Sequence, residues 1–592
     1  MTTTPPAGRV RRLVTAVLLA LLVLLPAGCV SVPDSGPVRD SASVLPDDAA
    51  VQAQYVPEGP AEGAEPADIV RGYLAAMLAY PTDPSIVREF LTEQAAADWQ
   101  PDAGAVIFSG TAGIQTSGRE VQVSLTQLGA LDGRGSWSST PPARAKLEID
   151  LTLVQVEGEW RISDPPPGIL IRQDFFEDRY NAYSLFFFDP TWSTLVPDQV
   201  YLADGDQTAT LLLRGLVRGP TKWLKDLKSL VPRSTDPTLS VPVDDDGVAP
   251  VAIGADVMSY PPEERRLLAA QLAWTLDQIP EIRAIRVTTD GAPVSLIDRQ
   301  ELLDADYGDS YDPADGSASR NLYALHGERI VTVPAVDSGA EVSPVAGPLG
   351  AGEVAVDSFG IGREGKVVAA VVGGGSVAVT NLLTEPSDLQ FWLDGGGSLL
   401  PPQWDRTGLL WVVDRQAEVG DDDSDDDGAG TAISTILDGS PQPVRVADEP
   451  LTPDRIEAFS VSRDGMRIAV LGGTGPDTRL LIARIVRPAK PGGLLRINRW
   501  REIITPVTPL ADFRDLDWAS PTELAVLARR AGESLQAFTV DIDGSDVQVS
   551  TLMDFKPTAI AATPTQDRPT VVSSAKGQLY SQTNERWAPY VL

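Results

Sequence analysis

VSRDGMRIAVLGG, at residues 461–473, joins a polar turn to a short apolar strand, and the chain repeats this phrase. Related phrases are IGREGKVVAAVVGG (361–374), WDRTGLLWVVD (404–414) and WASPTELAVLAR (518–529). Intervals of about 40 to 57 residues match the period of β-propeller blades. The sequence therefore predicts an all-β propeller over residues 320–592 with about six or seven blades. A pair of stacked β-sandwiches is the alternative, but it would not need the recurrent phrase.

Residues 66–174, upstream of this region, are predicted to form a small α+β module. Apolar residues recur at helical spacing in PADIVRGYLAAMLAY (66–80) and SIVREFLTEQAAADW (85–99), and strand-like alternation follows in AKLEIDLTLVQV (145–156). This order is similar to the cone of NTF2-like modules, a scaffold that serves enzymes and docking domains alike, so it assigns no role. Three tryptophans are expected in its core, or alternatively in the wall of a pocket between sheet and helices: Trp99, Trp137 and Trp160.

Residues 175–194 are dense in aromatic side chains, although the whole chain is only 6% aromatic. We interpret this stretch as a linker between two modules. If its aromatic side chains were exposed they would mark a binding surface, and if buried they would hold the two modules together.

Residues 195–300 are predicted to form a second α+β module. A helix is closed by Gly219-Pro220, LSVPVDDDGVAPVAI (239–253) predicts a hairpin, and the last strand ends at an Asp290-Gly291 turn. With LLLRGLVRGP (211–220), these features resemble the GerMN module. The resemblance implies an interaction domain.

The N-terminus predicts export and lipidation. Arginines precede an uncharged apolar run, Leu13 to Leu25, which is too short to span a bilayer, so residues 1–28 are interpreted as a signal peptide. Ala27-Gly28-Cys29 resembles the end of a bacterial lipobox, although Pro26 stands where an aliphatic residue is usual. The resemblance implies cleavage after Gly28, then S-diacylglycerol and N-acyl (palmitate-type) modification of Cys29. The alternative is an ordinary buried thiol beside a conventional cleavage site.

Residues 29–65 are rich in Pro, Ser, Gly and acidic residues, which is typical of a disordered tether. Two or more acyl chains hold a protein stably on a membrane. We therefore expect the protein on the extracytoplasmic face of the cell membrane, anchored by lipid. Cys29 is the only cysteine of the 592 residues, so the chain contains no intramolecular disulfide.

The composition argues against several classes of function. Lys and Arg number 48 against 82 Asp and Glu, a formal net charge of −34, which repels nucleic-acid phosphates, so no nucleic-acid partner is expected. His326 is the only histidine, which excludes a two-histidine metal site, and we expect a structural role for it. The acidic residues 421–427 favour a solvated loop over a calcium site, although calcium binding stays open.

No catalytic constellation stands out. The chain has no phosphate-binding Gly-rich loop ending in Lys-Ser/Thr and no Gly-x-Ser-x-Gly elbow near the histidine. Carboxylate pairs able to hydrolyse glycosides stay open, since their separation in space is not visible in sequence. We therefore expect no enzyme, no cofactor, no metal and no catalytic residue.

The order of these parts resembles the LpqB family of actinobacterial lipoproteins, which is associated with the two-component pair MtrA and MtrB. The most telling stretches are CVSVPDSGPV (29–38), GEWRISDPPPGI (158–169) and LLLRGLVRGPTKWL (211–224). The resemblance implies an accessory protein that contacts the extracytoplasmic domain of a sensor histidine kinase, modulates its signalling and affects envelope homeostasis. Only Cys29 carries over as a functional residue, and the partner-binding residues stay unknown.

The competing interpretation is a protein that binds or cleaves cell-wall glycan on the propeller face. Aromatic side chains could stack on sugars there, and the candidates are Trp404, Trp411 and Trp518.

Overall fold

The computed structural model describes residues 57–590 except 80–84, 298–299, 315–320, 335–340, 383–387, 419–428, 438–439, 449–452, 454, 489–494, 563–569 and 583–585. These residues belong to one compact unit. The predicted signal peptide, Cys29 and the acidic run 421–427 lie outside them. Over the described part of the chain, no helix combines the length and apolarity needed to cross a membrane.

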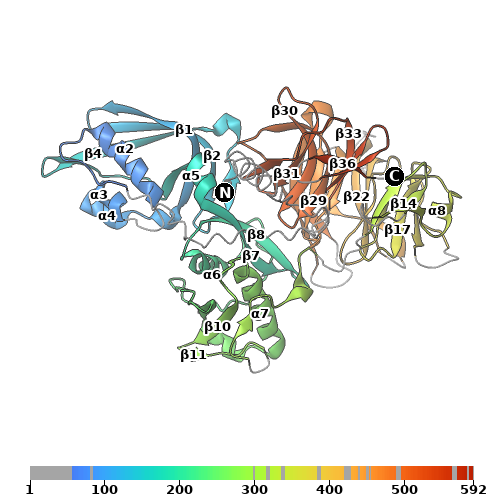
Figure 1. Cartoon of the computed structure of the whole chain (residues 1–592), viewed down its shortest axis with the longest axis horizontal. Helices are drawn as coiled ribbons and strands as arrows, with labels where there is room; N and C mark the ends of the chain where they lie inside the picture. Colours follow the sequence, from blue (N-terminus) through green and yellow to red (C-terminus); the bar gives the residue numbers. More distant parts are fainter. Residues whose placement is uncertain are drawn as a thin grey trace, which may run out of the picture. The chain divides into compact units, whose positions relative to one another are not determined.

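The first module packs three short helices against a curved sheet (Figure 1). The helices are α2 (Pro66–Ala76), α3 (Ser85–Glu89) and α4 (Glu93–Asp98). The sheet has the order β5-β4-β2-β1-β6, with β3 paired to β2 and only β6 running parallel to its neighbour. Its strands are β1 (Gly104–Ser117), β2 (Glu120–Asp132), β3 (Trp137–Ser139), β4 (Lys146–Val156), β5 (Glu159–Ile162) and β6 (Ile169–Arg172).

The second expected helix is divided into α3 and α4, so the prediction of one continuous helix over 85–99 is wrong. The chain leaves the helix at Leu91, which forms a β-bridge with Ile162, and the Thr92 N–H donates to the Ile162 carbonyl at 2.9 Å. The Thr92 hydroxyl then accepts from the Ala95 N–H at 3.2 Å and caps α4. Pairing with β5 therefore outweighs helical periodicity here.

The core of the first module contains the tryptophans expected there. Trp99 and Trp137 are buried, and Trp160 packs against the same core while half-buried. The indole N–H of Trp99 donates to the Gly168 carbonyl at 3.3 Å, so its polar atom is satisfied.

The stretch 175–194 is not a linker. It forms helix α5 (Gln173–Arg179) and strand β7 (Tyr180–Phe188), which pairs with β8 (Leu195–Ala203). Phe176 packs in the core of the first module, whereas Phe187 is fully buried in the core of the second. The aromatic side chains are dense because this stretch contributes to two cores.

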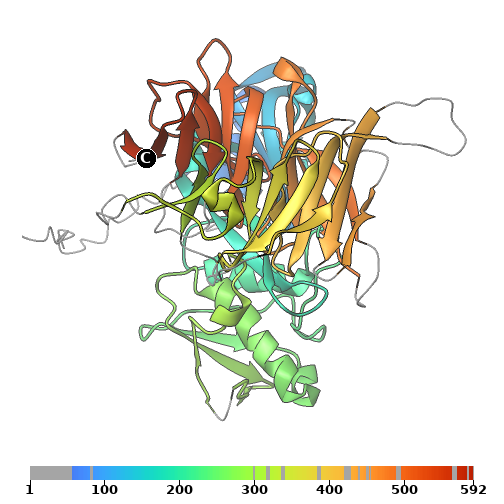
Figure 2. The same cartoon turned by 90° about the vertical axis from the view of Figure 1, so that its right-hand side faces the viewer.

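The second module packs two helices, α6 (Thr208–Arg218) and α7 (Pro262–Leu276), against its strands. Helix α7, the long green helix of Figure 2, packs against β7 and β12. The remaining strands form one sheet of order β11-β10-β12, with β9 parallel to β10. They are β9 (Val248–Ala252), β10 (Ala284–Thr289), β11 (Ala292–Pro293) and β12 (Leu303–Asp304).

The hairpin predicted over 239–253 is not formed. Only β9 is a strand. In the stretch before it, a backbone hydrogen bond goes to a side chain instead of a partner strand, since the Val241 N–H donates to the Thr210 hydroxyl at 3.0 Å. A side chain of α6 therefore takes the place that a partner strand would have had.

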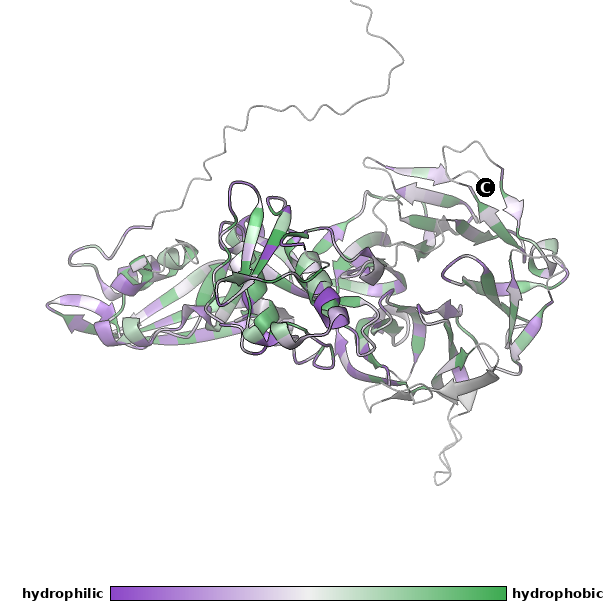
Figure 3. Cartoon of the chain, turned by 90° about the horizontal axis from the view of Figure 1, so that it is seen from below, coloured by the Kyte–Doolittle hydropathy of each residue, from purple (hydrophilic) through white to green (hydrophobic). Residues whose placement is uncertain are grey.

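Six further sheets follow one another around a ring, which is a β-propeller (Figure 3). The first three blades are formed by β13 (Leu322–Leu325), β14 (Ile330–Val333) and β15 (Ser343–Pro344); β16 (Val356–Ile361), β17 (Val367–Val372), β18 (Ser376–Asn381) and β19 (Gln390–Leu393); and β20 (Gln403–Trp404), β21 (Leu409–Glu418), β22 (Ala429–Leu437) and β23 (Ser440–Arg445). The short helix α8 (Pro348–Ala351) joins the first two.

The last three blades follow in chain order, and the fourth has an additional parallel strand, β24. They are formed by β24 (Ala447–Asp448), β25 (Ile456–Val461), β26 (Arg467–Gly472), β27 (Arg479–Val486) and β28 (Arg496–Glu502); β29 (Leu510–Ser520), β30 (Glu523–Arg530), β31 (Gln536–Asp541) and β32 (Val547–Val549); and β33 (Pro557–Ala561), β34 (Val571–Ser574), β35 (Leu579–Gln582) and β36 (Trp587–Tyr590).

Each blade buries both of its faces against its neighbours. In β17, Val368 and Ala370 pack with the first blade, whereas Ala369 between them packs with the third. Side chains alternate between the faces of a strand, so a run of consecutive apolar residues supplies both contacts. Equivalent clusters join the other neighbours. The continuous apolar strands of the repeated phrase are explained by this arrangement.

The four repeated phrases occupy equivalent places in the second to fifth blades. Each one spans the turn between the first two antiparallel strands of its blade: β16–β17, β20–β21, β25–β26 and β29–β30. The ring closes where the first blade meets the last, through Val331 and Val333 packed with Val571 and Tyr590. Among the described residues no strand of one end joins the sheet of the other, so side-chain packing closes the ring.

Candidate functional site

Cys29, the only site residue predicted from the sequence, lies outside the described residues, so the structure does not place it. The described residues instead bring charged groups together where the three modules meet. We take this junction as the candidate site, because it joins parts of the chain that are hundreds of residues apart.

A cavity of about 490 Å³ lies at the junction. The propeller contributes β26, the end of β28 and the turn after β31, while the second module contributes the segment after α6. The first module contributes the turn between β2 and β3. The charged side chains lining the cavity are Asp132, Arg134, Asp198, Arg218, Lys222, Arg467, Arg501 and Asp543.

Arg501 is held by contacts from the second module. Its guanidinium carbon lies 4.2 Å from the ring centroid of Trp223, and the Trp223 indole N–H donates to the Arg499 carbonyl at 2.9 Å. One Arg501 N–H makes a long bond of 3.4 Å to the Ile542 carbonyl. Burial lowers the pKa of Arg501 from its usual value, while Asp543 and Asp198 oppose this. The cation is therefore desolvated and only weakly compensated.

Arg467 is a charged residue at the start of an apolar strand, and it is fully buried. It forms an ion pair with Asp464 and lies 5.2 Å from the ring centroid of Trp518. Its Nε and Nη1 atoms have no hydrogen-bond partner among the described residues. Buried donors without partners are costly, so the positive charge of this guanidinium is incompletely compensated.

Arg134 connects the first two modules. It pairs with Asp132 at 3.0 Å and lies 3.8 Å from Asp198, and its Nη1 also donates to the Gly219 carbonyl at 2.7 Å. Burial raises the pKa of Asp198 to about 6, although the Thr221 N–H and Arg134 act against this shift. Asp198 is therefore largely ionised at neutral pH and gives Arg134 a second carboxylate.

A carboxylate turn of the propeller contacts both upstream modules. The Tyr201 hydroxyl donates to Asp541 Oδ2 at 2.7 Å, and Gln199 Nε2 donates to the same oxygen at 3.0 Å. The Ser139 hydroxyl donates to the Asp543 carbonyl at 3.0 Å. Burial, with the charge of Asp543 nearby, raises the pKa of Asp541 to about 7, and burial also raises the pKa of Asp543.

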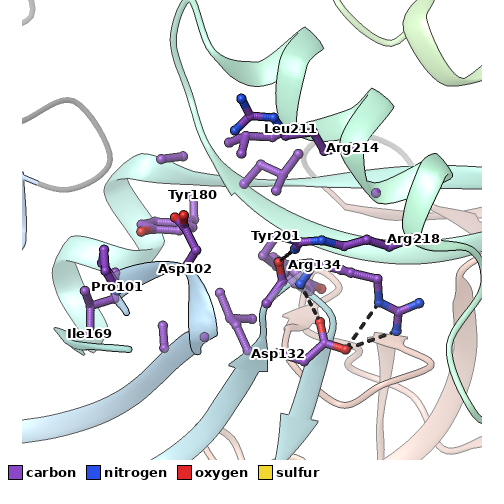
Figure 4. A pocket seen from close by; sticks show the side chains of 18 residues that line it. Pro101, Asp102, Asp132, Arg134, Ile169, Tyr180, Tyr201, Leu211, Arg214 and Arg218 are labelled. Atoms are coloured by element: carbon purple, nitrogen blue, oxygen red, sulfur yellow. Dashed lines mark hydrogen bonds and ion pairs between the residues drawn. The ribbon is translucent and has the colours of Figure 1, made fainter. Parts of the chain in front are cut away.

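A smaller cavity of about 100 Å³ lies between the first two modules (Figure 4). Arg134 and Arg218 line both cavities, and Figure 4 shows the Arg134 guanidinium beside the Asp132 carboxylate. Tyr180 and Tyr201 add aromatic walls to the smaller cavity. Its size suits one or a few water molecules rather than an organic ligand.

The propeller tryptophans proposed as sugar-stacking platforms are mostly unavailable. Trp411 is fully buried, and its indole N–H donates to Asp405 at 2.9 Å. Trp518 is buried and donates to the Ser460 carbonyl at 3.1 Å. Trp404 is half-buried and makes an edge contact with Trp392, with 5.6 Å between ring centroids. These side chains therefore act mainly in blade packing.

His326, for which we expected a structural role, lies exposed in the turn between β13 and β14. Its backbone N–H donates to the Arg329 carbonyl at 2.9 Å. Within the described ranges, no group of three or more His, Cys, Asp or Glu side chains is placed to hold a metal ion.

The fold defines a three-module protein in which two α+β modules precede a propeller. The family described as "Lipoprotein LpqB, N-terminal domain" matches residues 59–177, "Sporulation and spore germination" matches residues 184–295, and "Lipoprotein LpqB beta-propeller domain" matches residues 330–591. The chain belongs to the LpqB lipoprotein family, as the sequence indicated.

Relatives named "Lipoprotein LpqB" share most of the chain's length. The protein of Thermobifida fusca is 26% identical over 92% of each chain, and that of Streptomyces coelicolor is 28% identical over 89% of this chain and 88% of its own. The Mycobacterium bovis relative is 28% identical over 78% of this chain and 79% of its own. Among solved structures, a putative TolB from Agrobacterium tumefaciens aligns at 14% identity and a TM-score of 0.30, covering 40% of this chain and 81% of its own.

Sequence reasoning missed the junction. Arg467 carried a signal, because it is the only charged residue in the apolar run MRIAVLGG. Arg501 and Asp543 carried none, since polar residues around them look like ordinary turn and edge positions.

Proposed function

We propose that the protein is a lipid-anchored accessory protein on the extracytoplasmic face of the cell membrane. In this role it binds the extracytoplasmic domain of a two-component sensor histidine kinase, of the MtrB type, and modulates its signalling. The observation that carries the proposal is the match to lipoprotein relatives along about nine-tenths of the chain, with all three modules included.

Tethering supplies the physical mechanism. A protein and a kinase held on one membrane meet at a high effective concentration, so a weak contact becomes populated without a large interface. The acyl chains on Cys29 would supply the tether, and residues 29–65 would supply its reach.

A binding role without catalysis agrees with the junction. Its carboxylates already have structural partners: Asp541 accepts from Tyr201 and Gln199, and Asp198 accepts from the Thr221 N–H. The alternative of a glycan-acting propeller loses support, since Trp411 and Trp518 are buried.

The first test separates the anchor from the partner. Cys29→Ala should move the full-length protein from the membrane fraction to the soluble extracytoplasmic fraction, and mass spectrometry of the wild-type N-terminal peptide should find acylated Cys29. Retention of Cys29→Ala in the membrane fraction would overturn the anchor.

The second test addresses the kinase. Wild-type protein is captured after cross-linking in intact cells, and the co-purified proteins are identified and compared with those of Cys29→Ala. We expect a sensor histidine kinase with the wild type and its strong depletion with Cys29→Ala. Recovery of wall-synthesis enzymes or glycan without a kinase would contradict the proposed partner while leaving the anchor intact.

A further inference from the structure

We propose that the 490 Å³ cavity at the three-module junction binds a small solute through a phosphate or carboxylate group, held by Arg501, with the buried Arg467 adding positive charge behind it. Arg501 and Arg467 belong to the propeller, and Lys222 of the second module lies exposed beside them on the cavity wall. Binding at this cavity does not depend on the proposed kinase partner.

The charge of the cavity wall favours an anion. Five cationic side chains line it against three carboxylates, in a chain whose formal net charge is −34. Arg134 pairs with Asp132 and lies near Asp198. By contrast, Arg218, Lys222 and Arg501 have no carboxylate within 4.0 Å among the residues that the structure describes. A concentration of unpaired cations in an acidic protein attracts anions locally.

The geometry of Arg501 suits an oxyanion. Trp223 covers a face of the guanidinium, and this contact orients the group without using its N–H donors. The donors lie in the plane of the guanidinium, where a phosphate or carboxylate can accept two parallel hydrogen bonds. The long 3.4 Å bond to the Ile542 carbonyl occupies only one of them.

The two guanidinium groups are incompletely compensated by the protein. Arg467 Nε, Arg467 Nη1 and Arg501 Nε are buried without a hydrogen-bond partner among the described residues. The two guanidinium groups also repel each other, which contributes to the lowered pKa of Arg501. An oxyanion in the cavity would offset this repulsion through its negative charge.

Such a ligand would also hold the modules together. Lys222 and Trp223 belong to the second module, whereas Arg467 and Arg501 belong to the propeller. A ligand that contacts both binds the docked arrangement more tightly than the open one, so it stabilises docking by mass action.

Isothermal titration of the full-length protein in detergent tests the proposal, with inorganic phosphate and citrate as separate probes at constant ionic strength. We expect one-to-one binding of at least one probe with a dissociation constant of about 1 mM or tighter. A preference for phosphate or for citrate then identifies which group the site selects. Arg501→Gln should weaken binding about tenfold or more, because it removes a charged, bidentate donor.

Arg479→Gln is the matched control, because Arg479 forms an exposed ion pair with Glu502 at 3.7 Å and does not line the cavity. The Arg479→Gln variant should bind each probe with the affinity of the wild type, because the positive charge that it removes lies outside the cavity. Lys222→Gln, at an exposed position on the cavity wall, should weaken binding severalfold and keeps the test valid if Arg501→Gln fails to fold. Absence of binding by both probes would overturn the proposal, as would equal affinity in all three variants.

Discussion

Replacing Tyr201 by phenylalanine should loosen the contact between the propeller and the upstream modules. The Tyr201 hydroxyl donates to Asp541 Oδ2 at 2.7 Å and also contacts the Ser545 hydroxyl, across 340 residues of chain. Both Tyr201 and Asp541 are at least nine-tenths buried, so water does not readily replace the lost hydroxyl.

The size of the effect depends on the charge of Asp541. Its pKa is about 7, so at about pH 8 it is mainly ionised and the bond is charge-assisted. Losing a hydrogen bond to a charged, buried group costs about 2 kcal/mol, which corresponds to a factor of about 30 in the opening equilibrium. At about pH 5 the carboxyl is neutral, and the cost should fall to about 1 kcal/mol.

Native-state hydrogen exchange measures this change, through the amides of the turn from Asp541 to Asp546. These amides should exchange about 30 times faster in Tyr201→Phe at about pH 8, if opening of the contact exposes the turn. Tyr73→Phe is the control: the same hydroxyl is removed, but Tyr73 is fully buried and its hydroxyl has no partner among the residues that the structure describes. Equal protection in Tyr201→Phe and Tyr73→Phe would refute the reasoning.

Three further changes test other contacts. Burial raises the pKa of Asp541 from 3.8 to about 7, so between these pH values the docked state keeps a proton that the undocked state loses. The stability of the docked state should therefore fall as the pH rises from about 4 to about 7. Asp541→Asn should reduce this pH dependence in thermal melts. Asp405→Asn should destabilise the propeller by about 3 kcal/mol in urea titrations, since it leaves buried Arg487, 2.6 Å away, uncompensated. Thr92→Ala should cost about 1 kcal/mol by the same measurement, with Thr92→Ser close to wild type.

The propeller could be predicted because its sequence signal is local. The turns at Gly365, Gly408 and Gly465 all have positive φ, and each precedes a strand that is buried on both faces. The first blade lies within the predicted range but has no copy of the repeated phrase, and its turn, at His326 and Gly327, follows a strand that is only half-buried. Local signals also explain the error at Thr92, where helical periodicity continues across a break caused by pairing with β5.

The junction could not be predicted, because its contacts join residues that are far apart in the chain. Nothing near Tyr201 indicates a carboxylate 340 residues later, and nothing near Trp223 indicates the guanidinium of Arg501. The interpretation of residues 175–194 as a linker was wrong for a related reason. The composition left burial and exposure open, and it did not indicate that α5 and β7 contribute to two different cores.

In the part of the chain that the structure describes, side-chain packing closes the ring, and this has a consequence for how the propeller could be rearranged. Each described blade is built from one continuous stretch of chain, and the first and last blades meet through Val331, Val333, Val571 and Tyr590. The chain could therefore be joined between these two blades and reopened between any other pair without removing a strand from a sheet. The position of the chain ends in the ring is therefore not fixed by the packing of the blades, and circular permutants of the propeller should retain all six interfaces between blades.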